Sequence, residues 1–491
     1  MSANPIEHDV KPVDRSNGAG LPIGSTDPAV GDGAMNSIAL WFACLVATLG
    51  GFLFGYDWVV IGGAKPFYEA CFGITQPSEQ AWAMSSALVG CLAGALSAGV
   101  LSERLGRKRA LLISAAVFAA SALGTGMAQS VTEFVMWRVA GGVAIGMASA
   151  LSPIYIAEVA PAARRGQLVC LNELTIVLGI LGAQVVNWLI AGPIDPNATP
   201  LDLKDSWNGL IGWRRMFEAG FVPAAVFLVG LLFIPESPRW LAKRGEWQRA
   251  QDVLASLGGV TYAQRLIVDL RKDLKASAEN QPRASLREPR IKRALLVGVV
   301  LAVLQQWCGI NVIFNYAQEV FSAAGYSLSS MLFNIVITGI TMVVFTFVAI
   351  ATVENLGRRW LMLLGCGSLA LLYVALGFAY WTHQSGWPML LLVVGAIAVF
   401  AMTLGPITWV VLSEIFPTEV RGTSMAICTA ALWSACFVLT YTFPLLNAAI
   451  GTAGTFWFYA AICIAGLVFV ARYLPETKQR SLEEIQHLWR A

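Results

Sequence analysis

The sequence predicts an all-α integral membrane protein whose twelve transmembrane helices form two pseudo-symmetric six-helix domains. The composition is the first observation, since 57% of the 491 residues are hydrophobic and only 13% are charged, unlike soluble globular chains. The second is that apolar windows of about 20 residues recur, the length that a helix needs to cross about 30 Å of hydrocarbon. The third is an internal repeat, because short motifs after the second, fourth and sixth windows return after the eighth, tenth and twelfth.

Each apolar window is interpreted as a helix because a helix satisfies its own backbone hydrogen bonds inside lipid. No window shows the alternation of polar and apolar residues that is typical of a membrane β-barrel. The twelve predicted spans are 38–64, 80–101, 109–129, 133–157, 167–190, 213–234, 293–322, 329–353, 359–381, 387–413, 422–447 and 454–473.

The charges between the spans indicate how the chain is oriented. Lys and Arg gather on one side of the twelve-span threading, for instance at Arg107 and Lys108 after the second span and at Arg358 after the eighth. Short loops rich in Lys and Arg stay in the cytoplasm, so we expect a multi-pass protein of the cell membrane with both termini cytoplasmic. Residues 1–35 lack the features of a signal peptide and are expected to be a flexible cytoplasmic tail. The net charge of +3 gives no indication of a nucleic-acid partner.

Three motifs repeat at a spacing of about 250 residues. GVLSERLGRKR at 99–109 returns as ATVENLGRR at 351–359. AEVAPAARRG at 157–166 returns as SEIFPTEVRG at 413–422, and PESPRW at 235–240 returns as PETKQR at 475–480. Two homologous halves explain this pattern, and parallel repeats are typical of transporters that bind their cargo between the halves. The predicted domains are an N-terminal six-helix domain at 36–234, a cytoplasmic linker with short helices at 235–292, a C-terminal six-helix domain at 293–474 and a cytoplasmic C-terminal segment at 475–491.

The repeated motifs also predict a conformational latch. Gly106 and Gly357 permit tight turns, and the neighbouring arginines can pair with carboxylates or with helix C-termini. Such pairs hold one conformation until they break; the alternative is that the arginines only anchor the chain at the cytoplasmic surface. The predicted latch residues are Glu103, Arg107, Glu158 and Arg165 in the first half and Glu354, Arg358, Glu414 and Arg421 in the second.

A larger set of motifs resembles the sugar porter family of the major facilitator superfamily. The motifs are GYDWVVIGG, GVLSERLGRKR, AEVAPAARRG, PESPRWL, QQWCGINVIFNYA, GPITWVVLSEIFP, VRG and PET, and they extend over about residues 38 to 490. Each motif alone is weak, whereas the set is specific. The resemblance implies the major facilitator fold, alternating access by rocking of two domains, and a monosaccharide or polyol as cargo. We expect a monomer whose partners are a small sugar, a proton and the lipid bilayer.

Asp57, inside the first span, predicts a proton-coupling site. A charge inside the membrane costs about 2.5–3.5 kcal/mol on insertion scales unless it is paired or hydrated, and Arg138 is the only basic residue of the fourth span. Burial and a nearby guanidinium act in opposite directions on the proton affinity of a carboxylate, so a conformational change that alters their separation would couple transport to protons. The resemblance implies the same, because proton-coupled members carry Asp at this position and facilitative carriers typically carry Asn. A static pair that only fixes helix packing is the alternative.

The seventh span predicts a sugar site. Gln305, Gln306, Asn311 and Asn315 are four amides within eleven residues, and amides both donate and accept hydrogen bonds, as sugar hydroxyls require. The resemblance implies sugar contacts at Gln305, Gln306 and Asn311, and an aromatic contact at Trp433. The amides could instead bridge helices, and Trp433 could be an ordinary packing residue.

Glu173, in the fifth span, occupies a position where the family usually has Gln. Glu173, Gln184 and Asn187 fall on one helical stripe, so we expect Glu173 to face the cavity and to contribute to substrate binding. A permanently protonated acid that replaces the amide is the favoured interpretation. A second proton site, an ionised hydroxyl acceptor and a partner for a cationic cargo are the alternatives.

The second half departs further from the family pattern. The family commonly has Tyr at Asn315, Asn at Met342, and amides at Leu432 and Cys436. These changes replace polar groups of the site, so the sequence leaves open which sugar is carried, and a deoxy sugar or another less polar cargo is conceivable.

Two other functions compete with proton-coupled sugar import. A facilitative uniporter would use Asp57 only structurally, and a sugar sensor that does not transport often has a long cytoplasmic extension, whereas about 16 residues follow Pro475. An enzyme is not indicated, because the sequence has no nucleophile–base pair, metal-binding motif or phosphate loop. No cofactor is expected.

Overall fold

The computed structural model describes residues 37–161, 165–195, 199–279, 288–416 and 420–478, so the predicted tail at 1–35 lies outside the described residues. All regular structure in the described part of the chain is helical. The first half contains α1 (Ser37–Phe72), α2 (Pro77–Leu105), α3 (Arg107–Met127), α4 (Val131–Val159), α5 (Arg165–Ile190), α6 (Pro200–Asp205), a π-helical turn (Asn208–Gly212), α7 (Trp213–Glu218) and α8 (Phe221–Phe233), followed by α9 (Pro238–Lys243) and α10 (Trp247–Glu279). The second half contains α11 (Pro289–Trp307), α12 (Ile310–Asn315), α13 (Ala317–Ala323), α14 (Leu328–Leu356), α15 (Arg358–Trp381), α16 (Trp387–Met402), α17 (Leu404–Ile415) and α18 (Arg421–Tyr473).

The twelve predicted spans correspond to eleven helical stretches that are long and apolar enough to cross a membrane in the described chain. The difference lies in α18, whose 53 residues would extend about 80 Å if the helix were straight. Gly451, with φ 72° and ψ 172°, interrupts α18 and divides it into the predicted eleventh and twelfth spans. A positive φ of this kind favours glycine. The twelve-span prediction is therefore confirmed.

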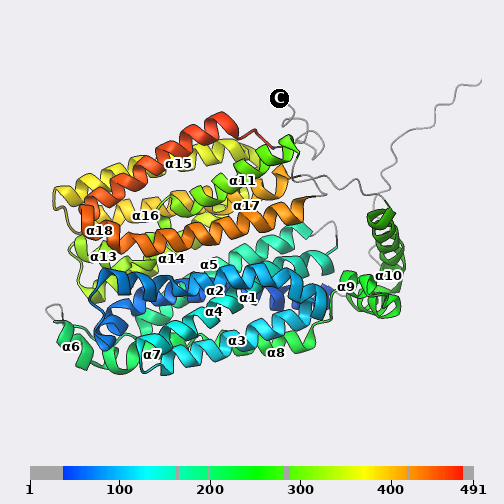
Figure 1. Ribbon diagram of the computed structural model, residues 1–491, viewed down its shortest axis with the longest axis horizontal. Helices are drawn as coiled ribbons and strands as arrows, with labels where there is room; N and C mark the ends of the chain where they lie inside the picture. Colours follow the sequence, from blue (N-terminus) through cyan, green and yellow to red (C-terminus); the bar gives the residue numbers. More distant parts are fainter. Residues whose placement is uncertain (1–36, 162–164, 196–198, 280–287, 417–419, 479–491) are drawn as a thin grey trace, which may run out of the picture.

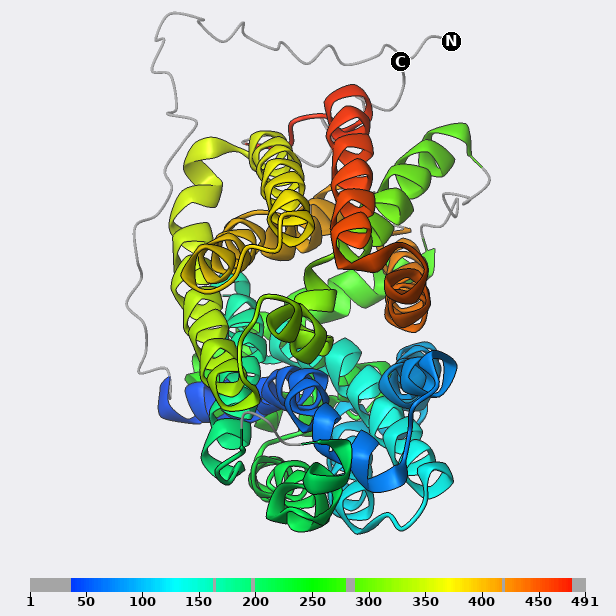
Figure 2. The same cartoon turned by 90° about the vertical axis from the view of Figure 1, so that its left-hand side faces the viewer.

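Two groups of long helices lie side by side. Helices α1 to α5 with α7 and α8 form the lower group in Figure 1, and α11 to α18 form the upper group. Figure 2 views the helices from the end that carries α6 and α13, and separates the same two groups. Helices α9 and α10 lie at the opposite end (Figure 1). We call the end with α9 and α10 the linker end, and the end with α6 and α13 the far end.

Helices α9 and α10 form a small structure of their own. Trp240, Leu254 and Ile267 belong to a separate buried cluster, against which Leu266 and Leu270 pack. The leucines follow the amphipathic spacing that is typical of a helix covering an apolar surface.

Small residues allow the long helices to approach closely. A Cβ atom on Gly55 of α1 would lie 1.9 Å from the backbone oxygen of Ile176, and one on Gly179 of α5 would lie 2.1 Å from that of Phe52. Both glycines are therefore required for the observed contact of α1 with α5, in the manner of close packing between membrane helices. Because Gly55 is two residues before Asp57 on α1, this contact with α5 sets the direction in which the Asp57 side of α1 faces.

The outer surface of the bundle is apolar. Leu371 is 74% exposed and Phe233 is 72% exposed. Exposing a large apolar surface to water is unfavourable, whereas lipid tails are as apolar as the side chains and can cover it. The surface is that of a protein embedded in a membrane.

Candidate functional site

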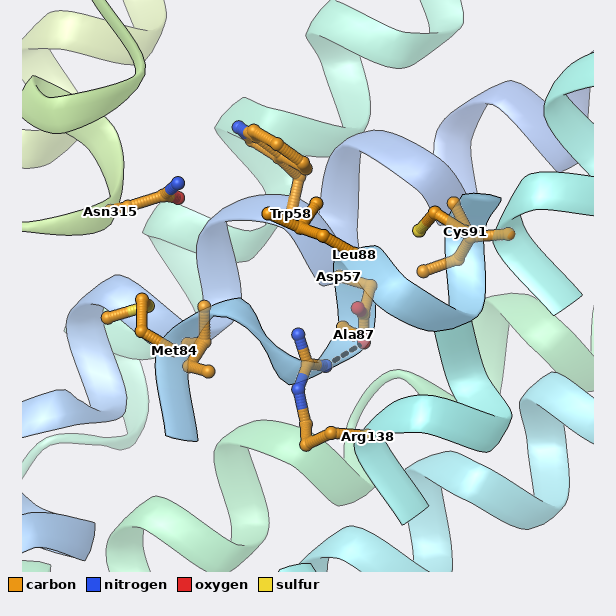
Figure 3. Close-up of a pocket in the computed structure, with 10 residues that line it drawn as sticks. Asp57, Trp58, Met84, Ala87, Leu88, Cys91, Arg138 and Asn315 are labelled. Carbon is orange, nitrogen blue, oxygen red and sulfur yellow. Dashed lines mark hydrogen bonds and ion pairs between the residues drawn. The ribbon is translucent and has the colours of Figure 1, made fainter. Parts of the chain in front are cut away.

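Asp57 and Arg138 form a buried ion pair between α1 and α4. The Nη1 atom of Arg138 lies 2.5 Å from Oδ1 of Asp57, and the two residues are 7% and 2% exposed. Figure 3 shows the guanidinium directed at the carboxylate. The guanidinium also lies over the ring of Phe217, 5.5 Å from its centroid, and its Nε atom has no hydrogen-bond partner among the described residues. The pair predicted from the sequence is therefore in contact, and the arginine keeps unused donor capacity.

A small cavity of about 20 Å³ adjoins this ion pair, which is room for about one water molecule. Its lining includes Asp57, Trp58, Met84 and Arg138 from the first half and Asn315 from α12 in the second half (Figure 3). The Oδ1 atom of Asn315 is buried and has no hydrogen-bond partner in the described structure. Asn315, predicted to contact substrate, thus lies beside the ion pair instead of among the other amides of its span.

The other three amides of the seventh span form a chain of hydrogen bonds. Asn311 Nδ2 donates to Gln306 Oε1 at 2.6 Å, Gln306 Nε2 donates to Gln305 Oε1 at 3.0 Å, and Gln305 Nε2 donates to the backbone oxygen of Gly405 at 2.9 Å. The chain is placed by a break in the helix, because Gly309 adopts the left-handed conformation with φ 88° between α11 and α12. This break brings amides on both sides of Gly309 to one location.

Aromatic rings from both halves meet near these amides. Trp433 of α18 is 3% exposed, and its ring lies 5.5 Å from that of Phe54 and 6.2 Å from that of Trp58, both on α1. Apolar faces of this kind suit the C–H surfaces of a sugar. Sequence reasoning identified Trp433 but missed Phe54 and Trp58, although both flank the GYD motif at helical spacing from each other.

Glu173 lies on α5 and is partly buried. Its side chain has no hydrogen-bond or ion-pair partner among the described residues. The polar residues on its predicted stripe have other contacts: Gln184 Nε2 donates to Thr338 Oγ1 at 3.4 Å, and Asn187 Nδ2 donates to the backbone oxygen of Val60 at 3.0 Å. The amide nitrogens of Gln184 and Asn187 therefore bridge helices, while their amide oxygens have no partner among the described residues. The carboxylate of Glu173 likewise remains available.

The predicted latch residues of the first half meet at the linker end. Arg107 Nε and Nη2 donate to the two carboxylate oxygens of Glu158 at 3.0 and 3.1 Å, and Nη2 also donates to Glu103 at 2.9 Å. Bidentate contacts of this type are among the stronger hydrogen bonds of proteins. Arg165 opens α5, but its side chain is outside the described part of the structure.

The second half repeats this arrangement. Arg358 Nη2 donates to Glu414 Oε1 at 3.0 Å, while Arg421 donates to the backbone oxygen of Phe416, just after the end of α17. Glu354 lies in α14, and its side chain is not described. The described ion pairs of the predicted latch join helices within one half, so each pair stabilises its own bundle.

Sequence reasoning missed the carboxylates that cap α3 and α15. Glu236 Oε1 accepts hydrogen bonds from the backbone N–H groups of Arg107 and Lys108 at 2.8 and 3.0 Å. Glu476 accepts from the corresponding groups of Arg358 and Arg359 at 3.0 and 3.1 Å. A carboxylate at a helix N-terminus satisfies free donors and complements the helix dipole. The signal was present, because both glutamates belong to the repeated PE motif.

A second buried group of charges was also missed. Lys65 of α1 is 2% exposed and lies 3.0 Å from a carboxylate oxygen of Glu69. Its Nζ atom also contacts Glu319 of α13 at 2.5 Å. The sequence signal was a lysine and a glutamate four residues apart at the end of an apolar span.

The helical bundle has a buried ion pair in the first half, a row of amides in the second, and aromatic rings from both halves that meet between them. These features define a membrane transporter of the major facilitator fold. Residues 43–489 match the family described as Sugar (and other) transporter. The chain belongs to this family.

Curated relatives of similar length include three named proton symporters. The chain is 36% identical to the D-xylose-proton symporter of Escherichia coli K12, over 92% of this chain and 96% of the relative. It is 36% identical to the arabinose-proton symporter of Bacillus subtilis, over 90% and 93% of the two chains. It is 34% identical to the galactose-proton symporter of Escherichia coli K12, over 92% of this chain and 95% of the relative.

Solved structures of the xylose transporter XylE from Escherichia coli resemble the whole fold. An inward open conformation gives a TM-score of 0.79 at 34% identity, over 92% of this chain and all of that chain. The form bound to 6-bromo-6-deoxy-D-glucose gives a TM-score of 0.76 at 36% identity, with the same coverage.

Proposed function

We propose that the protein is a proton-coupled symporter that imports a monosaccharide by alternating access. The observation that carries the proposal is the buried contact of Asp57 with Arg138, beside a cavity that the second half completes with Asn315. Membership of the sugar transporter family and the proton symporters among its relatives support the same function.

Protons couple to transport through the Asp57–Arg138 pair. While the pair is intact, the guanidinium attracts the carboxylate; a local movement of α1 against α4, within the first domain, lengthens the contact and frees the carboxylate to accept a proton. A protonated Asp57 no longer attracts Arg138, so proton binding in turn favours the separated arrangement. The Nε atom of Arg138 has no partner among the described residues, and the adjoining cavity has room for about one water molecule that can hydrate the separated groups.

The cargo binds between the two halves. Gln305, Gln306 and Asn311 supply donors and acceptors for hydroxyl groups, and Trp433 supplies an apolar face. Glu173 contributes from the first half as a protonated acid or as a hydroxyl acceptor. In the second half, Leu404 of α17 and Leu432 of α18 are both buried, and such aliphatic side chains favour a sugar with fewer hydroxyl groups than glucose.

The repeat defines the moving bodies. We place the first six-helix domain at 36–234, the linker at 235–292 and the second domain at 293–474, with the linker end and both termini in the cytoplasm by the positive-inside rule. The bidentate Arg107–Glu158 pair and its counterpart Arg358–Glu414 keep each domain intact while the domains rock. The protein acts as a monomer, because both faces of the cargo site come from one chain.

Two measurements on purified protein test this function. A thermal-shift panel of hexoses, pentoses, deoxy sugars, polyols and amino sugars identifies the cargo, since a ligand of the folded state raises the melting temperature. The identified sugar is then added to de-energised proteoliposomes while the external pH is recorded. Symport predicts alkalinisation of the medium. Uptake of the sugar without alkalinisation would establish a facilitative uniporter instead, and binding without uptake would establish a sensor.

A further inference from the structure

Lys65 connects the two halves of the chain at the far end. It lies on α1, in the first half, and its ammonium group is held between Glu69 of the same helix and Glu319 of α13, in the second half. The ammonium group also lies 5.7 Å from the ring centroid of Tyr316. Glu69 is 8% exposed and the side chain of Glu319 is 24% exposed, so this ion pair between halves is largely screened from solvent.

The helix that carries Glu319 is attached through two breaks. Gly309, with φ 88°, separates α11 from α12, and Tyr316, with φ −120° and ψ 37°, separates α12 from α13. Backbone hydrogen bonds continue across Tyr316, from its N–H to Val312 and from the N–H of Val320 to Tyr316, but the conformations of Gly309 and Tyr316 interrupt the regular helix. Lys65 therefore contacts a short helix that is separated from α11 by two changes of backbone conformation.

Other contacts between the halves lie toward the far end. A Cβ atom on Gly62, less than one turn before Lys65, would lie 2.4 Å from the backbone oxygen of Phe314. Gln184 of α5 donates to Thr338 of α14, and the rings of Trp188 and Phe333 lie 5.8 Å apart. The far end is thus closed by direct contact between the halves.

Glu69 gives the lysine a second partner that does not depend on the second half. A buried ammonium group without a partner is strongly unfavourable, so a lysine paired only with Glu319 would resist separation of the halves. Because Glu69 is four residues away on the same helix, it stays within reach of Lys65 when α13 moves away. The ion pair between the halves is then free to break and re-form without leaving the lysine unpaired.

We propose that Lys65 and Glu319 form a gate at the far end that must break when the transporter opens to that side, with Glu69 as the partner that retains Lys65 in the open state. This inference rests on alternating access within the proposed function, but on neither the identity of the cargo nor the coupling to protons. Neither Lys65 nor Glu319 is part of the proposed cargo or proton site.

The test measures the distance across the far end in purified protein without sugar or proton gradient. Spin labels are attached to cysteines introduced by Thr75→Cys and Thr382→Cys, at positions that are exposed in loops of the first and second half. Cys71 and Cys170 are replaced by Ser so that they do not react with the label. The Glu319→Gln variant removes the bridging carboxylate and is expected to shift the distance distribution toward longer values. The Glu69→Gln variant is the matched control, because it also removes one carboxylate from Lys65 but leaves the bridge, and its distribution is expected to match the parent.

The charge-reversed variant Lys65→Glu with Glu319→Lys separates a gate from a folding defect. It restores an ion pair across the halves and is expected to return the distribution to the shorter distances. Unchanged distances in Glu319→Gln, or equal opening in Glu69→Gln, would overturn the gate. Because no transport is measured, failure of this test leaves the proposed symport standing, and failure of the pH measurement in proteoliposomes leaves the gate standing.

Discussion

Asn315 and Asp57 line the same small cavity although they belong to different halves of the chain. Asp57 contributes the carboxylate that contacts Arg138, and Asn315 contributes a buried amide oxygen that has no partner among the described residues. Asn315 follows Asn311 by one helical turn, and Asn311 begins the hydrogen-bonded row of amides. Helix α12 therefore lies between the proposed proton site and the proposed cargo site.

Replacing Asp57 should uncouple transport from protons. Asp57→Asn keeps a hydrogen-bond acceptor for Arg138 but cannot ionise, so we expect the variant to exchange sugar across the membrane without accumulating it uphill. The measurement compares uphill uptake with counterflow in proteoliposomes. Asp205→Asn, an exposed position outside the spans, is the control and should do both. Full uphill accumulation by Asp57→Asn would refute the proton site.

Substitutions on the two sides of Gly309, at Gln306 in α11 and at Asn315 in α12, should separate cargo effects from proton effects. Gln306→Leu removes a hydrogen-bonding side chain from the amide row, and we expect the sugar dissociation constant to rise about tenfold, since one lost hydrogen bond is worth about 1–2 kcal/mol. Asn315→Leu removes the amide beside Asp57, and we expect it to change the pH dependence of uptake with a much smaller effect on sugar affinity. Calorimetric binding and uptake at a series of pH values measure the two effects. A larger loss of affinity in Asn315→Leu than in Gln306→Leu would return Asn315 to the cargo site.

Glu173→Gln tests the role of the unpartnered acid on α5. If Glu173 is protonated and takes the place of an amide, the glutamine of the variant has the same shape and hydrogen-bonding capacity as the protonated acid. We then expect sugar uptake with an unchanged pH profile. The profile is recorded with the sugar found in the thermal-shift panel. A displaced profile with retained sugar binding would instead identify Glu173 as a second proton site, and loss of a cationic cargo alone would identify it as a charge partner.

The capping glutamates at the linker end should contribute to stability. Glu236→Gln and Glu476→Gln each remove a charge that accepts two backbone hydrogen bonds at a helix N-terminus. We expect each to cost about 1 kcal/mol of stability, detected as a lower melting temperature in detergent. Glu246→Gln is the control, because its ion pair with Arg249 is solvent-exposed and surface pairs contribute little. Equal melting temperatures for all three variants would contradict a role of the caps.

The amino-acid sequence determined the class of protein, because length, apolar windows and repeated motifs are local properties. Windows of about 20 residues specify membrane helices with little help from their surroundings. The pairing of Asp57 with Arg138 could also be predicted, since a lone acid and a lone base inside the membrane have few other ways to be stabilised. The Arg107–Glu158 and Arg358–Glu414 contacts were predictable for a similar reason, since each motif occurs twice.

The tertiary structure alone decided where the amide side chains of span seven lie relative to the two halves. The chemistry of the four amides of span seven is the same, but the structure, with its left-handed turn at Gly309, holds three of them in one row and places Asn315 against the first half. Lys65 and Glu319 are more than 250 residues apart in the chain, and no local pattern predicts that α13 turns back toward α1. Contacts of this kind depend on how the two halves meet, which is a property of the packed bundle and not of any segment within it.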